Sequence, residues 1–295
     1  MKFFLWLTSM FWIGSSIAQS SPGLITNKDD NTLLWEVSGN GLAAPSYLFG
    51  TFHLLCKEDI HFSNSVDQAL KNSGKIYMEL DLDDPGILLG GLMMMNMKQG
   101  KKLKDLYTLE EYKRVEAFFK DSLNTGLGLF QHMKPLLLMS MIYPKLMPCN
   151  SISGVEEELM NLAKEKDKEI RGLETMAFQA SVFDSIPYET QAAEMLKTID
   201  STEKSRVYLD SMMVAYKNQD MKIMEALMSN EDFGMEESQD VLLDSRNKNW
   251  VEQLKTIMKN EPVFVAVGTG HLVGEKGLIA LLRKEGYHVR PLENK

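Results

Sequence analysis

The chain has 295 residues, of which 44% are hydrophobic and 25% are charged, and this balance is typical of a globular protein. Its formal net charge of -9 excludes nucleic acid as an expected partner, because phosphate binding requires a basic face. Two cysteines are too few for a disulfide scaffold. Cys56 and Cys149 could form one bridge in an exported protein, and two unpaired buried thiols are the alternative.

Residues 1–18 have the pattern of a cleaved secretory signal peptide. Lys2 supplies the positive start, residues 3–13 form an apolar run, and residues 16–18 (Ser-Ile-Ala) form a small-x-small cleavage site. The apolar run is shorter than the roughly 20 residues that a membrane-spanning helix needs. We therefore expect an exported protein, periplasmic or secreted, with no membrane span in the mature chain; a membrane anchor is the alternative.

One domain is expected over residues 32–293, after a short extension at 19–31, because no linker rich in Pro, Gly or Ser divides this part of the chain. Strands are predicted where β-branched, aromatic and aliphatic residues run together between turn residues. The first two should form a hairpin. The predicted strands cover residues 32–39, 45–51, 74–82, 169–174, 262–268 and 287–292.

Helices are predicted between these strands, and the middle third of the chain has more of them than simple alternation requires. Alternating strands and helices predict an α/β fold with a central mixed or mostly parallel sheet and helices on both faces. The extra helices predict a helical insertion that covers the sheet. The helical segments cover residues 65–73, 86–97, 103–147, 154–169, 178–229, 235–258 and 277–286.

Polar side chains follow four of the predicted strands. Gly-Thr-x-His occurs twice, in "FGTFH" ending at His53 and in "VGTGH" ending at His271, and each copy follows a strand. Glu79 and Asp81 end a third strand, and Glu174 ends a fourth. In an open α/β sheet, ligands bind outside the carboxyl ends of the strands, so these side chains are expected at one edge.

The chemistry of this set favours a divalent metal site. Strand alternation places Glu79 and Asp81 on one face, where imidazoles arrive from other strands. A mixed set of imidazole and carboxylate ligands suits Mn, Co or Zn. Gly50 and Gly268 would let the backbone turn tightly and approach a ligand closely. On spacing alone, two unrelated histidines that cap turns remain the alternative.

The segment "DSRNKNW" precedes the last Gly-Thr-x-His copy on a predicted helix. Arg246 and Asn247 could contact an anion or an oxyanion there, and a solvated helix face is the alternative. No Gly-x-Ser-x-Gly occurs, and neither cysteine has a histidine nearby that would indicate a cysteine protease.

The order of these segments resembles the TraB/PrgY/GumN superfamily, which includes bacterial GumN-like proteins and the animal Tiki proteins. The resemblance covers residues 33–291, and the paired Gly-x-x-His motifs and the Glu-Leu-Asp strand end are its most specific parts. "GVEEEL" departs from the more usual Gly-Val/Leu-Asp, which leaves the role of Glu156 open. The segments are "LWEVSG…SYLFGTFH", "YMELDLDDP", "GVEEELMNLAKEKDKEIRGLET", "DSRNKNW" and "FVAVGTGHLVGEKGLIALLRKEGYHV".

Tiki proteins are metal-dependent proteases that clip the amino terminus of secreted Wnt ligands, with a preference for Mn or Co. The resemblance therefore implies that His53 and His271 are metal-site residues and that Glu79 is the essential carboxylate, as ligand or general base. Glu174, Arg246 and Asn247 fall on family positions near that site.

The resulting hypothesis is metal-assisted hydrolysis of a peptide or protein substrate. Glu79 or Glu174 would accept the proton of the attacking water, and Arg246 would donate to the oxyanion. Two alternatives remain open. Structural relatives include erythromycin-esterase-like enzymes, which implies a non-proteolytic hydrolase, and the pheromone-shutdown members TraB and PrgY imply a protein that sequesters peptide without cutting it.

Overall fold

The computed structural model describes residues 30–81, 83, 91, 94–229 and 238–295. The predicted signal peptide (1–18), almost all of the extension (19–31) and most of the helix predicted at 86–97 lie outside the described residues. None of the helices in the described part of the chain is long and apolar enough to cross a membrane.

A six-stranded mixed sheet forms the centre of the fold, with strand order β6-β4-β7-β2-β1-β8. The four strands β6, β4, β7 and β2 are parallel, whereas β1 runs antiparallel to both β2 and β8. All six predicted strands are present, and the first two form the expected hairpin. The strands are β1 (Leu34–Ser38), β2 (Ser46–Thr51), β4 (Lys75–Leu80), β6 (Glu169–Glu174), β7 (Val263–Gly268) and β8 (His288–Pro291).

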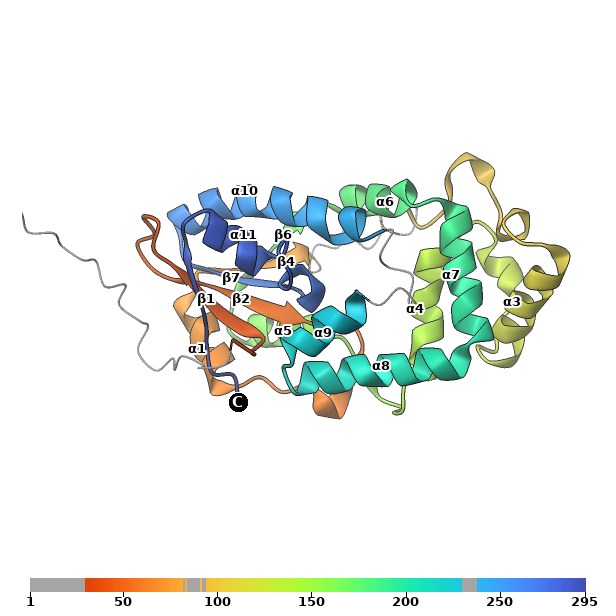
Figure 1. The fold of residues 1–295 in the computed structure, drawn as a ribbon, viewed down its shortest axis with the longest axis horizontal. Helices are drawn as coiled ribbons and strands as arrows, with labels where there is room; N and C mark the ends of the chain where they lie inside the picture. Colours follow the sequence, from red (N-terminus) through yellow and green to blue (C-terminus); the bar gives the residue numbers. More distant parts are fainter. Residues whose placement is uncertain (1–29, 82, 84–90, 92–93, 230–237) are drawn as a thin grey trace, which may run out of the picture.

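Helices lie on both faces of this sheet, as predicted. Figure 1 shows α1 and α5 on one side and α10 and α11 on the other. The helices begin where their sequences provide caps or favourable charge: Ser63 caps the start of α1, and three glutamates occupy the first turn of α5, where the helix dipole favours negative charge. Their bounds are α1 (Asn64–Asn72), α5 (Val155–Glu165), α10 (Ser245–Asn260) and α11 (Leu278–Lys284).

Burial along the strands follows their place in the sheet. Residues 263–267 of the inner strand β7 are all buried, because helices cover both of its faces. Strand β4 alternates instead: Ile76, Met78 and Leu80 are buried, whereas Tyr77 and Glu79 are half-buried. The predicted alternation is therefore confirmed, and Glu79 lies on the less crowded face of its strand.

The helical insertion of the middle third has an apolar core of its own. The prediction that it covers the sheet is confirmed for α8 and α9, whose buried side chains pack in the main core with the strands, whereas Figure 1 shows α3, α4 and α7 beyond the carboxyl ends of the strands. Phe119, Ile142 and Met195 from these three helices pack in one cluster, so their apolar faces are covered by one another. The insertion comprises α3 (Leu109–Asp121), α4 (Pro135–Leu146), α6 (Met176–Ser185), α7 (Tyr188–Asp200), α8 (Thr202–Lys217) and α9 (Met221–Met228).

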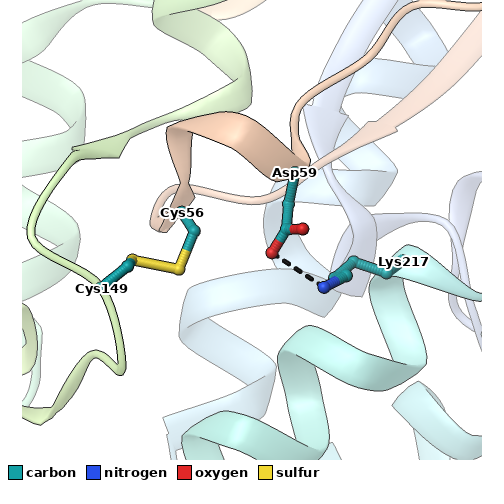
Figure 2. Close-up of a disulfide and its surroundings, with 4 residues drawn as sticks. All are labelled: Cys56, Asp59, Cys149 and Lys217. Atoms are coloured by element: carbon teal, nitrogen blue, oxygen red, sulfur yellow. Dashed lines mark ion pairs between the residues drawn. A yellow bond between two sulfur atoms is a disulfide. The ribbon is translucent and has the colours of Figure 1, made fainter.

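A disulfide joins Cys56 and Cys149, which decides between the two alternatives that the sequence left open (Figure 2). It lies beside a two-stranded ladder of β3 (Leu55–Cys56) and β5 (Ile152–Ser153), which is too short to produce a sequence pattern. An ion pair of 2.8 Å between Asp59 and Lys217 connects the same region to α8. The loop that follows β2 is thus fastened to the segment that begins α5.

Candidate metal and catalytic site

The two Gly-Thr-x-His copies lie next to each other in space. Strands β2 and β7 are parallel neighbours, and Thr51 of the first copy pairs in register with Gly268 of the second. The Thr269 hydroxyl donates to the Thr51 carbonyl at 2.9 Å. His53 lies two residues beyond β2, and His271 ends a short helix, η8 (Thr269–His271), that begins directly after β7. The two copies of the motif therefore lie at the carboxyl ends of two neighbouring parallel strands.

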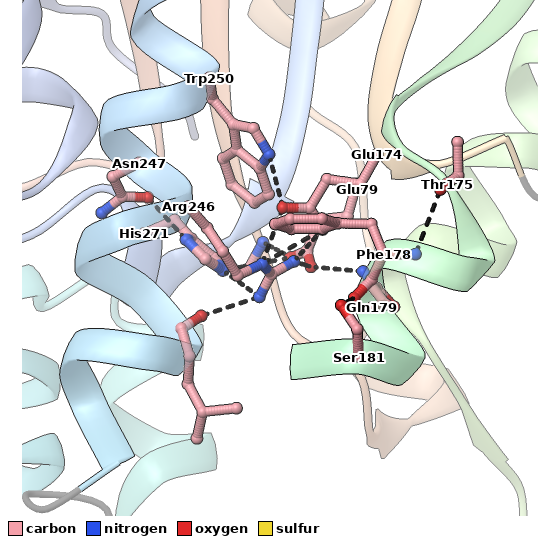
Figure 3. Close-up of polar contacts among 12 residues, drawn as sticks. Glu79, Glu174, Thr175, Phe178, Gln179, Ser181, Arg246, Asn247, Trp250 and His271 are labelled. Atoms are coloured by element: carbon pink, nitrogen blue, oxygen red, sulfur yellow. Dashed lines mark hydrogen bonds and ion pairs between the residues drawn. The ribbon is translucent and has the colours of Figure 1, made fainter. Parts of the chain in front are cut away.

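Arg246 is the centre of a buried polar cluster at this edge (Figure 3). Its Nη2 donates to Glu79 Oε2 at 2.6 Å and to Glu174 Oε2 at 2.9 Å, and its Nε donates to Glu174 Oε1 at 2.9 Å. Its Nη1 lies 2.8 Å from the Leu242 carbonyl and 3.2 Å from His271 Nε2. All five N–H groups of the guanidinium are therefore engaged in this structure, and Arg246 could bind a substrate oxyanion only by releasing one of these contacts.

Arg246 lies in the first turn of α10, and the segment before this helix is π-helical. A π-helical turn, η7 (Asp240–Asp244), runs directly into α10, and the Leu242 carbonyl in that turn accepts from Arg246. Trp250 follows Arg246 by one helical turn, donates from Nε1 to Glu174 Oε1 at 2.8 Å, and lies with its ring 4.8 Å from the guanidinium carbon. Sequence reasoning did not identify Trp250, although its i+4 spacing from Arg246 was a usable signal.

The two carboxylates of the cluster differ in access. Both oxygens of Glu174 accept hydrogen bonds, and its side chain is 1% exposed, so it supports Arg246 and cannot reach a substrate. The Glu79 side chain is 16% exposed. Burial alone would raise the pKa of Glu79, but nearby His271, Arg246 and His53, together with the Gly268 N–H, lower it to about 2. Glu79 is therefore ionised at neutral pH.

His271 is buried and is contacted on both ring nitrogens. Its Nδ1 lies 2.7 Å from Asn247 Oδ1, its Nε2 lies 3.2 Å from Arg246 Nη1, and its ring lies 4.3 Å from that of Trp250. Burial lowers the pKa of His271 from 6.5 to about 4, because a charged imidazolium would lose its hydration. The ring is therefore neutral at physiological pH.

This lowered pKa predicts a loss of stability in weak acid. Between pH 6.5 and 4 the unfolded chain takes up a proton at His271 that the folded chain does not, so the free energy of unfolding should fall by about 3 kcal/mol as the pH decreases. Urea unfolding at several pH values measures this decrease. His271→Gln should flatten the profile in this window, and an equally steep profile in that variant would contradict the assignment.

His53 has a different environment although its motif is the same. Its side chain is 74% exposed, and its Nδ1 lies 2.8 Å from Glu156 Oε1 in the first turn of α5. The hydrogen bond with Glu156 raises the pKa of His53 above its ordinary value. Backbone pairing of Val155 N with the Phe52 carbonyl, at 3.0 Å, holds the two segments together. The residue whose role the sequence left open is thus the partner of His53.

Comparison with known proteins places this geometry in a family. The sequence profile described as the TraB/PrgY/gumN family matches residues 33–291. The chain belongs to this family. No solved structure matches the chain significantly.

The curated relatives of this TraB/PrgY/gumN protein are metalloproteases by name. It is 22% identical to Metalloprotease TIKI1 of Danio rerio, with 88% of this chain and 63% of the relative covered. It is also 22% identical to Metalloprotease TIKI1 of Homo sapiens (88% and 61%) and to the Metalloprotease TIKI homolog of Amphimedon queenslandica (90% and 62%). The chain thus spans less than two thirds of the length of these relatives.

The side chains around Gly268 fit the divalent metal that these names imply. A Cβ atom at Gly268 would lie 3.3 Å from Glu79 Oε1, 3.8 Å from His271 Cδ2 and 3.9 Å from His53 Nε2, so the three side chains surround one space. Each imidazole has its Nδ1 held by an oxygen, from Glu156 or Asn247, so Nε2 is the nitrogen that a metal could use, and at His53 the metal would have to displace the proton that the raised pKa favours. Such outer partners are typical of metal-binding histidines.

The nitrogens of His53 and His271 and the Glu79 oxygen are farther apart than the ligands of one metal ion would be. Within the described residues, the one set of three His, Cys, Asp or Glu ligand atoms that lie within 4.8 Å of one another is Cys56, Glu58 and Cys149, and its sulfurs form the disulfide. Metal binding at Gly268 therefore requires the exposed ring of His53 to move toward Glu79. It also requires Arg246 Nη1 to release His271 Nε2.

The remaining predicted residues lie at the same edge of the sheet. Gly50 is needed for packing, because a Cβ there would lie 2.8 Å from Thr269 Oγ1. Asp81 lies one residue beyond β4 and is half-buried. Gln179 was not predicted; it reaches from α6 to Glu79 Oε2 at 3.4 Å (Figure 3), and no local pattern marks that contact.

Proposed function

We propose that this protein is a metal-dependent hydrolase, a peptidase, that binds a divalent metal through His53, Glu79 and His271. One observation carries the proposal: His53 Nε2, a Glu79 oxygen and the His271 ring surround the space above Gly268, and His271 Nε2 lies 3.7 Å from that oxygen. The buried charges support it as well, since Glu79 and Glu174 share one guanidinium and leave a net negative charge for a cation to balance. Mn, Co or Zn suits this mixed ligand set.

The chain's own residues have distinct tasks in this proposal. The metal, when bound, supplies a Lewis acid for the scissile carbonyl and a more acidic water. A carboxylate with a pKa of about 2 is a weak proton acceptor at neutral pH, so Glu79 is better suited to hold the cation than to act as the general base. Arg246 keeps Glu79 ionised, and Glu174 and Trp250 hold Arg246 in place.

We also propose that the protein is exported, to a periplasm or to the medium, after removal of residues 1–18. The Cys56–Cys149 disulfide supports this localisation, because disulfides persist in oxidising compartments and are rare in the cytosol. Mass spectrometry of the protein secreted by an expressing cell tests it, and a retained Met1 in the mature product would contradict it.

Metal analysis of the purified mature protein tests the proposed site. The wild type should retain about one equivalent of Mn, Co or Zn, and His53→Ala should lose it, because the exposed ring of His53 can be removed without opening the core. His61→Ala replaces another exposed histidine and is the matched control. Chelation should abolish cleavage of a peptide library by the wild type.

The alternatives predict other results in the same experiment. A sequestering protein would hold library peptides intact, with or without metal, and an esterase-like enzyme would cleave ester substrates and leave peptides uncut. Absence of metal in the wild type after reconstitution would reject the proposed metal site.

A further inference from the structure

The neighbours of His271 determine which of its nitrogens carries the proton. Asn247 Oδ1 can only accept a hydrogen bond, so the proton of the neutral ring must lie on Nδ1, 2.7 Å away. The Arg246 guanidinium can only donate, so Nε2, 3.2 Å away, must present its lone pair. The two neighbours, on opposite sides of the ring, require the same tautomer.

The orientation of the Asn247 amide is itself fixed. Its Nδ2 donates to the Lys276 carbonyl at 2.9 Å, and a rotated amide would place two oxygen atoms against each other. Lys276 is held in turn by an ion pair of 2.6 Å with Asp244, a buried residue at the end of η7. The turn after His271 is therefore anchored on the helix that also carries Arg246.

We propose that Asn247 is a positioning residue that keeps His271 protonated on Nδ1 and so presents the Nε2 lone pair to the Glu79 side of the site. The tautomer follows from the geometry alone. The consequence for metal affinity rests on the proposed function, because it requires His271 to be a ligand. Outer partners of metal-binding histidines are typically worth 10-fold to 100-fold in affinity.

Nitrogen-15 NMR of the metal-free wild type at neutral pH tests the tautomer directly. We expect His271 to show a protonated Nδ1 and an unprotonated Nε2, with an Nδ1 proton that exchanges slowly because the ring is buried. A protonated Nε2, or a mixture of both forms, would overturn the proposal. This measurement needs no metal, so it remains decisive if the proposed metal site fails.

Two variants separate positioning from packing. Asn247→Leu removes the acceptor and should lose the protected Nδ1 proton and weaken Mn binding about 10-fold to 100-fold. Asn247→Asp keeps the acceptor at Nδ1 but places its second oxygen against the Lys276 carbonyl, so it should lose stability while keeping the Nδ1 proton and binding Mn more tightly than the leucine variant. It keeps the test decisive if the leucine variant does not fold.

The control is Gln191→Leu, which removes another buried amide, one that caps Leu136 N and the Phe183 and Ile186 carbonyls in the insertion. It should lose stability without changing the His271 signals. An Asn247→Leu variant with an unchanged Nδ1 proton and unchanged Mn affinity would overturn the proposal.

Discussion

Replacing Arg246 with methionine should lower the free energy of unfolding by about 3–5 kcal/mol. Methionine fills much of the same space, so the loss comes mainly from charge. Glu174, whose side chain is 1% exposed, would keep only the Trp250 hydrogen bond, and Glu79 would lose its shortest contact. A buried carboxylate without a counter-charge is among the most destabilising features that one substitution can create.

Urea unfolding of the variant at pH 7 measures this loss. Arg114→Met is the matched control, because Arg114 pairs with Asp200 at the surface, where an ion pair contributes less than about 1 kcal/mol. A loss below about 1 kcal/mol in Arg246→Met would show that the buried carboxylates are compensated by another group. Proton release on unfolding, measured at the same pH, would then identify a glutamate that is protonated in the folded variant.

Replacing Glu79 with glutamine should abolish metal-dependent cleavage while leaving the protein folded. Glutamine keeps the shape of the side chain and an oxygen that can accept from Gly268 N–H or from Arg246. It removes the negative charge that a cation needs. The loss of metal affinity should therefore exceed about 100-fold, which is the upper range for replacing a residue that only orients a metal-binding histidine. The cluster would also lose its net negative charge.

The measurement is kcat/KM for a peptide from the library screen, with Mn titrated and the fold checked by circular dichroism. Glu169→Gln is the control, since Glu169 is an exposed carboxylate on β6 at the opposite edge of the sheet. A folded Glu79→Gln protein that cleaves at the wild-type rate would remove Glu79 from the mechanism.

The sequence predicted the central sheet well because its strands have clear local signals. Residues 263–267 are all apolar and residues 75–80 alternate. Each pattern follows from which faces of the strand are buried, so it can be found in the strand's own sequence. The ladder of β3 and β5 has two residues on each side, too few for any periodicity. The place of the helical insertion depends on which apolar faces meet, and amphipathic patterns do not specify a partner.

The sequence predicted which strands deliver the site, but not what surrounds each side chain. His53 and His271 have the same local motif, yet one is exposed beside Glu156 and the other is buried beneath α10. That difference comes from helices distant in sequence. The engagement of every Arg246 donor is likewise a tertiary property. An oxyanion role for this residue would require one of these contacts, such as that of Nη1 with His271, to be released.

The inner position of β7 has a consequence for the synthesis of the protein. This strand lies between β4 and β2, but more than 250 residues are translated before it. Until then, β4 with β6 and β2 with β1 are separate pieces with open edges, and His53 and Glu79 have no common neighbour. The growing chain therefore cannot assemble its site on the ribosome before nearly all of it has been made, and any hydrolytic activity is withheld until then.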